Sequence, residues 1–130
     1  MIIAVDFEGT LHNGTYPVIG NPMPHAVEAM KKLKSNGHRI IITTCRPDSL
    51  QHQMIDFLGK NEIPFDLINE NFPEIIAKFK NPRKIYADIY IDNKDILGLP
   101  PWNLVNDLIF DRSALISIQR YLPLILKNKI

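Results

Sequence analysis

Several features that define other classes of protein are scarce or missing in this sequence. Cys45 is the only cysteine among the 130 residues, so no disulfide forms within the chain, which fits a reducing compartment. No apolar run is long enough for a membrane-spanning helix, and no basic leader precedes the first apolar segment. The formal net charge of +1 gives no general attraction to nucleic acid or to anionic lipid. These absences favour a soluble cytoplasmic protein.

The composition is that of an ordinary globular domain. Hydrophobic residues make up 45% of the chain and charged residues 22%, as is usual for soluble domains. A chain of this length builds one core. We therefore expect a single domain over 1–130, with its core in about 1–110 and an apolar helical tail over 111–130, interrupted by Pro123. The apolar residues of the tail either complete the core or pack against a second copy of the chain, forming a homo-oligomer.

Segments with strand patterns and segments with helix patterns alternate along the chain. Isoleucine-rich runs predict strands over 2–5, 39–44, 63–68 and 84–92, and apolar spacing predicts helices that begin near Pro24, Pro47, Pro73 and Pro101. Such alternation predicts a parallel sheet with right-handed crossovers. The predicted fold class is α/β, a Rossmann-like three-layer α/β/α arrangement around a central parallel sheet.

Two carboxylates stand at the carboxyl end of the first predicted strand. Asp6 ends that strand, and Glu8 follows two residues later. In open α/β sheets this end of the strands is where ligands bind, and a carboxylate there can attack phosphorus or hold a metal ion. The alternative is that Asp6 and Glu8 only stabilise the turn that follows.

Two later strands also end in polar residues. Thr44 ends the second predicted strand, and Asp92 ends the last one, with Asn93 and Asp95 just after it. Lys84 begins the strand that leads to Asp92. A carboxylate nucleophile, a hydroxyl, a lysine and a second acidic strand end are the parts that phosphoryl transfer requires, because its catalysis is mainly positioning and charge stabilisation.

Three segments carry these residues, namely IIAVDFEGTL, RIIITT and DIYIDNKD. In this order they resemble the three strand motifs of the haloacid dehalogenase superfamily. The first is similar to its opening motif, an aspartate two residues before a second acid and then Gly-Thr. The second and third are similar to the family's strands that end in a hydroxyl residue and in acids. The resemblance covers about residues 1–110, with the spacing of a minimal member that has no cap domain.

The resemblance implies the chemistry of the acidic residues. Asp6 attacks the substrate phosphorus and forms an aspartyl-phosphate. Glu8 takes the position of the family's second acid, which protonates the leaving group and then activates water. The implied cofactor is Mg²⁺, held by Asp6, Asp92 and the backbone carbonyl of Glu8, a set of oxygen ligands that suits this ion.

The resemblance also implies roles for a hydroxyl and a lysine. Thr44 donates a hydrogen bond to a phosphoryl oxygen, although it could instead only cap the following helix. Lys84 offsets the charge between the nucleophile and the phosphoryl group. Other lysines compete with it for this role: Lys78, Lys80 and Lys94.

Glu8 and Asn93 depart from the family's pattern, because aspartate is usual at the first position and a further acid at the second. Glutamate is one methylene longer, so we expect metal and phosphate binding with slowed turnover. The alternative is a phosphate- or metal-binding regulatory module on the same fold. A receiver domain, which also carries acids on parallel strands, is a third hypothesis, but its phosphorylated aspartate lies on a middle strand.

The substrate cannot be identified from the sequence. No insertion is long enough for a cap domain, so the expected site is open to a small-molecule phosphate ester or a phosphorylated macromolecule. The loop from Leu11 to Met23 directly follows the candidate site, so we expect it to lie over the site as a flap. His12 and Tyr16 are its candidates for contact with the substrate.

Overall fold

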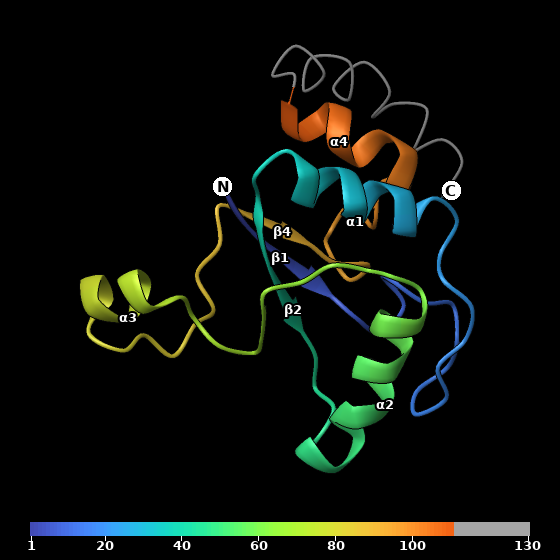
Figure 1. The fold of residues 1–130 in the computed structure, drawn as a ribbon, viewed down its shortest axis with the longest axis horizontal. Helices are drawn as coiled ribbons and strands as arrows, with labels where there is room; N and C mark the ends of the chain where they lie inside the picture. The colour runs from blue at the N-terminus through green and yellow to red at the C-terminus, as the bar shows by residue number, and fades with distance from the viewer. Residues whose placement is uncertain (111–130) are drawn as a thin grey trace.

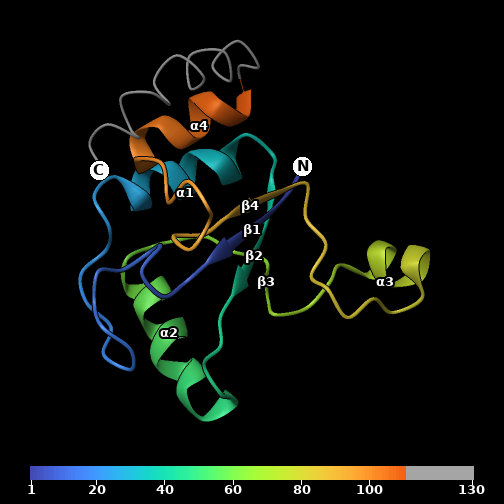
Figure 2. The ribbon, with the colours of Figure 1, turned by 180° about the vertical axis from the view of Figure 1, so that it is seen from behind.

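The computed structural model describes residues 1–110, and the predicted tail over 111–130, with its expected oligomer contact, lies outside the described residues. The strands are β1 (Ile2–Asp6), β2 (Arg39–Thr43), β3 (Leu67–Ile68) and β4 (Ile89–Ile91). The helices are α1 (Ala26–Ser35), α2 (Asp48–Lys60), α3 (Pro73–Phe79) and α4 (Trp102–Phe110). The four strands form one parallel sheet in the order β3-β2-β1-β4 (Figures 1 and 2; Figure 2 labels β3). The predicted α/β fold is confirmed.

Each face of the sheet is covered by an apolar cluster. On one face, alternate strand residues pack against α1, α2 and α4: Ile3, Val5, Ile40 and Ile42 against Met30, Leu58 and Trp102 among others. On the other face, the intervening residues Ile2, Ala4 and Ile41 pack with Phe72 and Ile75, at the start of α3 and within it. Figures 1 and 2 show α1 and α4 side by side. Because both faces are buried, β1 and β2 are almost continuous apolar runs. None of the helices in the described part is long and apolar enough to cross a membrane.

The last strand is shorter than the predicted segment 84–92. Only Ile89–Ile91 pairs with β1, because the backbone of Lys84 and Tyr86 bonds to a side chain instead of a neighbouring strand. The side chain of Asn71 accepts from the backbone N–H of Tyr86 (2.7 Å) and donates to the carbonyl of Lys84 (3.0 Å). These bonds satisfy the hydrogen-bonding groups of the backbone that have no partner strand here.

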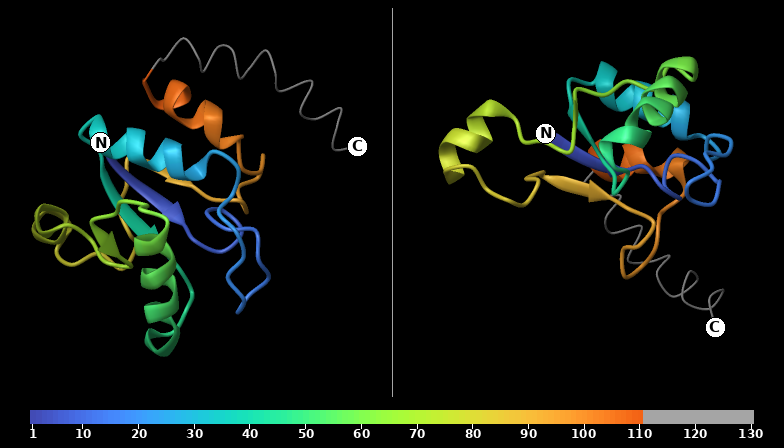
Figure 3. Two further views of the ribbon diagram at one scale, coloured as in Figure 1. Left: turned by 45° about the vertical axis from the view of Figure 1, so that its right-hand side comes forward. Right: turned by 90° about the horizontal axis from the view of Figure 1, so that it is seen from below.

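The register of the sheet brings the strand ends together. Asp6 pairs with Thr43, and Val5 pairs with Ile91, so Asp92 follows directly beside the end of β1. Because all the strands are parallel, their carboxyl ends share one edge. The loop after β1 and the turn after β4 both extend from this edge (Figure 3).

Candidate active site

The Thr10 hydroxyl connects the end of β1 with the turn after β4. It donates to Asp6 Oδ2 (3.0 Å) and accepts from the backbone N–H of Asn93 (2.9 Å). Thr10 is fully buried, and its carbonyl accepts from the indole N–H of Trp102 (2.8 Å). Gly9 has φ +74°, a conformation that favours glycine, and a Cβ there would displace the Asn93 side-chain amide 2.5 Å away. Hydrogen bonds of Thr10 therefore join the loop after β1 to the turn after β4 and to α4, which lie more than eighty residues later in the chain.

Asp6 lies in an environment that disfavours its negative charge. The pKa of this carboxyl is raised from its ordinary value of 3.8 to about 6, chiefly because burial removes water from the carboxylate. The Thr10 hydrogen bond lowers the pKa, the charges of Asp92 and Glu8 raise it, and the charge of Lys94 lowers it. Asp6 is therefore ionised at neutral pH but is more basic than an ordinary aspartate.

The acidic residues at this edge fit a magnesium ion. Among residues 1–110, no group of three or more His, Cys, Asp or Glu side chains is placed to hold a metal. Mg²⁺, however, needs only one or two carboxylates, because it keeps several waters and takes carbonyl and phosphate oxygens. Asp6 and Asp92 are two carboxylates close enough that one raises the pKa of the other, and the Glu8 carbonyl is two residues along. A divalent cation bound here would relieve this repulsion.

The side chain of Glu8 is held by two donors from separate segments. Arg46 donates from Nε to Oε1 and from Nη2 to Oε2, the latter at 3.3 Å. His12 Nε2 donates to Oε2 at 2.8 Å. The Arg46 and His12 side chains are fully buried, and that of Glu8 is 22% exposed. Both carboxylate oxygens are therefore occupied by protein donors.

The loop after β1 is fixed by the same residues. His12 Nδ1 accepts from the backbone N–H groups of Gly14 (3.0 Å) and Gly20 (3.2 Å), so the ring proton is on Nε2, facing Glu8. Arg46 Nη2 also donates to the carbonyl of Pro17 (2.9 Å). The expected contact of His12 with substrate does not fit this position, because the ring is buried and both nitrogens are bonded within the protein.

Tyr16, the other flap candidate, is half exposed at 51%. Its ring lies 5.3 Å from the guanidinium carbon of Arg46, so the tip of the loop rests on the same arginine that holds Glu8.

Thr44 lies where the sequence predicts, directly after β2. Its hydroxyl accepts from the backbone N–H of Arg46 (3.0 Å), which leaves the hydroxyl proton for another acceptor. Asn69, just after β3, accepts from the Thr44 N–H (2.9 Å) and donates to its carbonyl (2.7 Å). Two side-chain bonds therefore fix the backbone that presents this hydroxyl.

The structure does not bring Lys84 to this edge. Lys84 precedes the amino end of β4, and its ammonium lies 5.1 Å from the ring centre of Tyr90. Lys94, one of the lysines that compete with Lys84 for the role, lies two residues after Asp92. Its charge lowers the pKa of Asp6. Its backbone N–H donates to Asp92 Oδ1 (2.9 Å). Lys94 is the cation placed to act on the strand-end carboxylates.

Sequence reasoning missed three residues that build the site: Thr10, Arg46 and Asn69. Thr10 belongs to the DFEGT segment, and its position directly after a turn glycine could have indicated that it lies beside Asp6. Arg46 is a basic residue two positions after the predicted strand 39–44, and this position could have indicated that it lies at the same sheet edge as Glu8. Nothing in the sequence singled out Asn69, whose φ of +51° lies in the left-handed region that asparagine tolerates.

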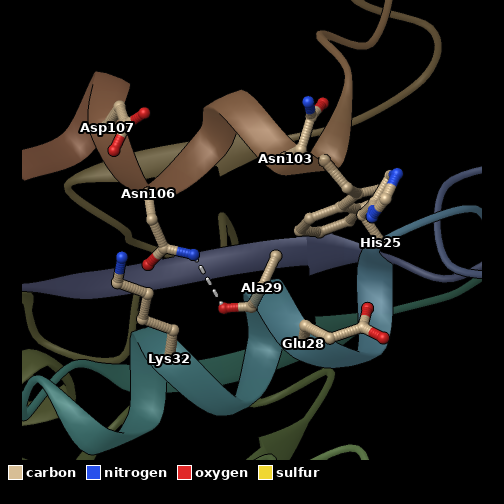
Figure 4. A pocket seen from close by; sticks show the side chains of 8 residues that line it. His25, Glu28, Ala29, Lys32, Asn103, Asn106 and Asp107 are labelled. Atoms are coloured by element: carbon tan, nitrogen blue, oxygen red, sulfur yellow. Dashed lines mark hydrogen bonds between the residues drawn. The ribbon is translucent and has the colours of Figure 1, made fainter.

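A separate pocket lies between α1 and α4 (Figure 4). Its lining comes from the first turns of α1 and from α4: His25, Glu28, Ala29, Lys32, Trp102, Asn103, Asn106 and Asp107. Asn106 donates to the Ala29 carbonyl (3.0 Å), and its Oδ1 is buried without a hydrogen-bond partner within residues 1–110. Trp102 also bonds to the Thr10 carbonyl, but Asp6, Glu8 and Asp92 do not line this pocket.

Comparisons with known proteins agree with this arrangement. The model of the haloacid dehalogenase-like hydrolases matches residues 3–99, a range that includes Asp6, Thr44 and Asp92. A solved structure, described as that of a conserved protein coded by a locus of Bacteroides thetaiotaomicron, is similar at 34% sequence identity and a TM-score of 0.78. The similarity covers 86% of this chain and 91% of that chain. The search of curated proteins gave no match.

Proposed function

This chain belongs to the haloacid dehalogenase-like hydrolase family, and on that premise we propose that it is a Mg²⁺-dependent phosphatase with Asp6 as its nucleophile. The observation that carries the proposal is the meeting of Asp6 with Asp92 and Lys94 at one sheet edge, where the charges of Asp92 and Lys94 both act on Asp6. Metal ions, carboxylate nucleophiles and lysines are the usual means of handling a transferring phosphoryl group.

The proposed reaction starts with an Asp6 carboxylate oxygen attacking the phosphorus. The P–O bond to the leaving group breaks, and its electron pair stays on the leaving oxygen. Water then attacks the aspartyl-phosphate, which breaks the bond between phosphorus and the Asp6 oxygen and releases inorganic phosphate. Asp6 is ionised at pH 7, as a carboxylate nucleophile must be.

The surrounding residues handle charge. The Thr44 hydroxyl is the donor for one phosphoryl oxygen, and the Lys94 ammonium offsets the negative charge that builds up between Asp6 and the phosphoryl group. Mg²⁺ would be held by Asp6, Asp92 and the Glu8 carbonyl, and it supplies charge neutralisation and a template for the phosphoryl oxygens.

The proposed substrate is a small-molecule phosphate ester or a phosphorylated macromolecule. Support comes from the absence of an inserted domain among residues 1–110, which leaves the sheet edge without a cap. We also propose a cytoplasmic location. The exposed free thiol of Cys45 is compatible with this location.

The proposal is tested by measuring phosphate release from 4-nitrophenyl phosphate with Mg²⁺. Asp6→Asn should lose activity, because an amide oxygen is a poor nucleophile. Asp56→Asn is the matched control, since Asp56 is an exposed carboxylate on α2, and it should behave as wild type. Equal release by wild type and Asp6→Asn would move the chemistry away from this edge.

A second candidate function is a phosphate- or metal-binding module with little turnover. The observation that favours it is the state of Glu8, whose oxygens are both occupied by Arg46 and His12. Mg²⁺-dependent binding of inorganic phosphate, measured by calorimetry, without Asp6-dependent release from any ester, would support this function over the phosphatase.

A further inference from the structure

We propose that the pocket between α1 and α4 binds a small molecule that carries a primary ammonium group. The pocket has a volume of about 150 Å³, the size of a cavity that holds one benzene molecule, or about six non-hydrogen atoms. Its floor is buried and its rim is exposed: Ala29, Trp102 and Asn106 form the floor, and His25, Glu28, Lys32, Asn103 and Asp107 form the rim. Asp6 and Asp92 do not line it, so the proposal does not depend on the proposed function.

The amide oxygen of Asn106 is the strongest sign of a ligand. Asn106 is only 6% exposed, and its Nδ2 donates to the Ala29 carbonyl (3.0 Å). Because a carbonyl only accepts, the amide nitrogen must face Ala29, and the planar amide then turns Oδ1 away from it (Figure 4). Oδ1 is buried and has no hydrogen-bond partner within residues 1–110. Since a buried acceptor without a donor is unfavourable, the pocket offers a bonding position to an N–H group.

The neighbouring donors do not fill this position. The indole N–H of Trp102 donates to the Thr10 carbonyl (2.8 Å). The Lys32 ammonium is exposed on the rim and does not bond to Asn106. A donor brought by a bound molecule satisfies the Asn106 oxygen.

The charge of the rim favours a cation. Glu28 and Asp107 add two negative charges to it, and Lys32 adds one positive charge. Neither carboxylate forms an ion pair with a side chain in the described part of the chain. An ammonium group supplies both an N–H donor for the buried oxygen and a positive charge for the rim, and a hydrogen bond from a charged donor is stronger than one from a neutral donor.

Trp102 makes binding directly observable, because it is the only tryptophan in the chain and it lines the pocket. Its fluorescence is titrated with butylammonium chloride and with tetramethylammonium chloride. Both salts are taken to about 100 mM at constant ionic strength, because molecules this small bind weakly. The two cations have the same charge and the same number of non-hydrogen atoms, but only butylammonium carries N–H groups.

The comparison of the two cations isolates the hydrogen bond to Asn106. We expect butylammonium to bind about 10–100-fold more tightly than tetramethylammonium, the effect of one hydrogen bond from a charged donor. Equal affinity for the two cations would overturn the proposal. The absence of a saturable fluorescence change with butylammonium would overturn it as well.

Asn106→Leu tests the buried oxygen itself. The variant should bind butylammonium about 10–100-fold more weakly than wild type and tetramethylammonium equally well. Asn61→Leu is the matched control, because Asn61 also donates Nδ2 to a backbone carbonyl, that of Phe57 (2.8 Å), but follows α2 and does not line the pocket. It should bind butylammonium as wild type does. Wild-type affinity in Asn106→Leu would contradict the proposal.

Substitutions on the exposed rim extend the test to variants that do not disturb the core. Glu28→Gln combined with Asp107→Asn should weaken the binding of both cations by the same factor, about 2–10-fold, and unchanged affinity would contradict the role of the rim charges. Lys32→Met removes the competing cation and should bind butylammonium at least as tightly as wild type. Binding that appears only in Lys32→Met would show that the Lys32 ammonium occupies the site in the protein itself, and would overturn the proposal.

Discussion

Replacing Asp6 by Asn should make the metal-free protein more stable at neutral pH. The folded protein holds Asp6 with a pKa of about 6, against an ordinary value of 3.8. This difference corresponds to ~3 kcal/mol between the two protonation states. The carboxylate is partly exposed, so solvent screening reduces this to ~1.5 kcal/mol. Asparagine removes the charge but keeps an oxygen that accepts the Thr10 hydrogen bond.

The effect of pH follows from the sign of the shift. Because the folded-state pKa is raised, the contribution of Asp6 to stability is fully present below pH 3.8 and is lost as the pH rises through about 6. Asp6→Asn should therefore melt about 5 °C above wild type at pH 7.5 and at the same temperature as wild type near pH 3.5.

Thermal melts of the metal-free protein at both pH values test this reasoning. Asp56→Asn serves as the control and should show no gain. Added Mg²⁺ should raise the melting temperature of wild type more than that of Asp6→Asn, because the ion neutralises the carboxylate that the variant lacks. A variant that melts at or below wild type at pH 7.5 would refute the electrostatic reasoning.

Three further substitutions test separate parts of the site. Lys94→Met should lower kcat/KM for 4-nitrophenyl phosphate by about 100-fold, because it removes one group that stabilises transition-state charge. Lys84→Met is the control and should keep a kcat/KM near that of wild type. A larger loss in Lys84→Met than in Lys94→Met would assign the charge-neutralising role to Lys84. Thr10→Val should lower the free energy of unfolding in urea by ~1–3 kcal/mol, because Asp6 and the Asn93 N–H lose a buried partner, and no loss would mean that the link is not needed. Arg46→Met should cost ~2–3 kcal/mol in the same assay, because Glu8 loses its guanidinium partner and keeps only the hydrogen bond from His12. A neutral result would show that the ion pair does not stabilise the fold.

The sheet and its reactive edge followed from the sequence because their causes are local. Isoleucine runs define buried strands, and parallel strands bring their carboxyl ends to one side, so Asp6, Thr44 and Asp92 were predicted to lie along one edge. The helix starts likewise followed from prolines and apolar spacing, and α3 begins at the predicted Pro73.

The role of Lys84 could have been rejected from strand geometry. A strand rises about 3.3 Å per residue, so a residue eight positions before Asp92 in an extended segment lies roughly 26 Å away, at the opposite edge of the sheet. Lys94 needed only the turn after β4 to reach the carboxylates.

The state of Glu8 could not have been predicted from the sequence. Its partners Arg46 and His12 come from two different loops, and the loop after β1 folds back so that His12 pairs with both Glu8 and Pro22. A long-range network of buried side chains leaves no periodic pattern in the chain. The departure from aspartate was visible, but its physical meaning depends on these three-dimensional contacts.

The most direct measurement is the site of phosphorylation. The protein is mixed with Mg²⁺ and acetyl phosphate or 4-nitrophenyl phosphate, quenched in acid and reduced with borohydride, and the modified residue is identified by mass spectrometry of its peptides. A nucleophilic Asp6 predicts modification at position 6 alone, which disappears in Asp6→Asn. Modification at another residue, or steady release of phosphate with Asp6 never modified, would contradict it.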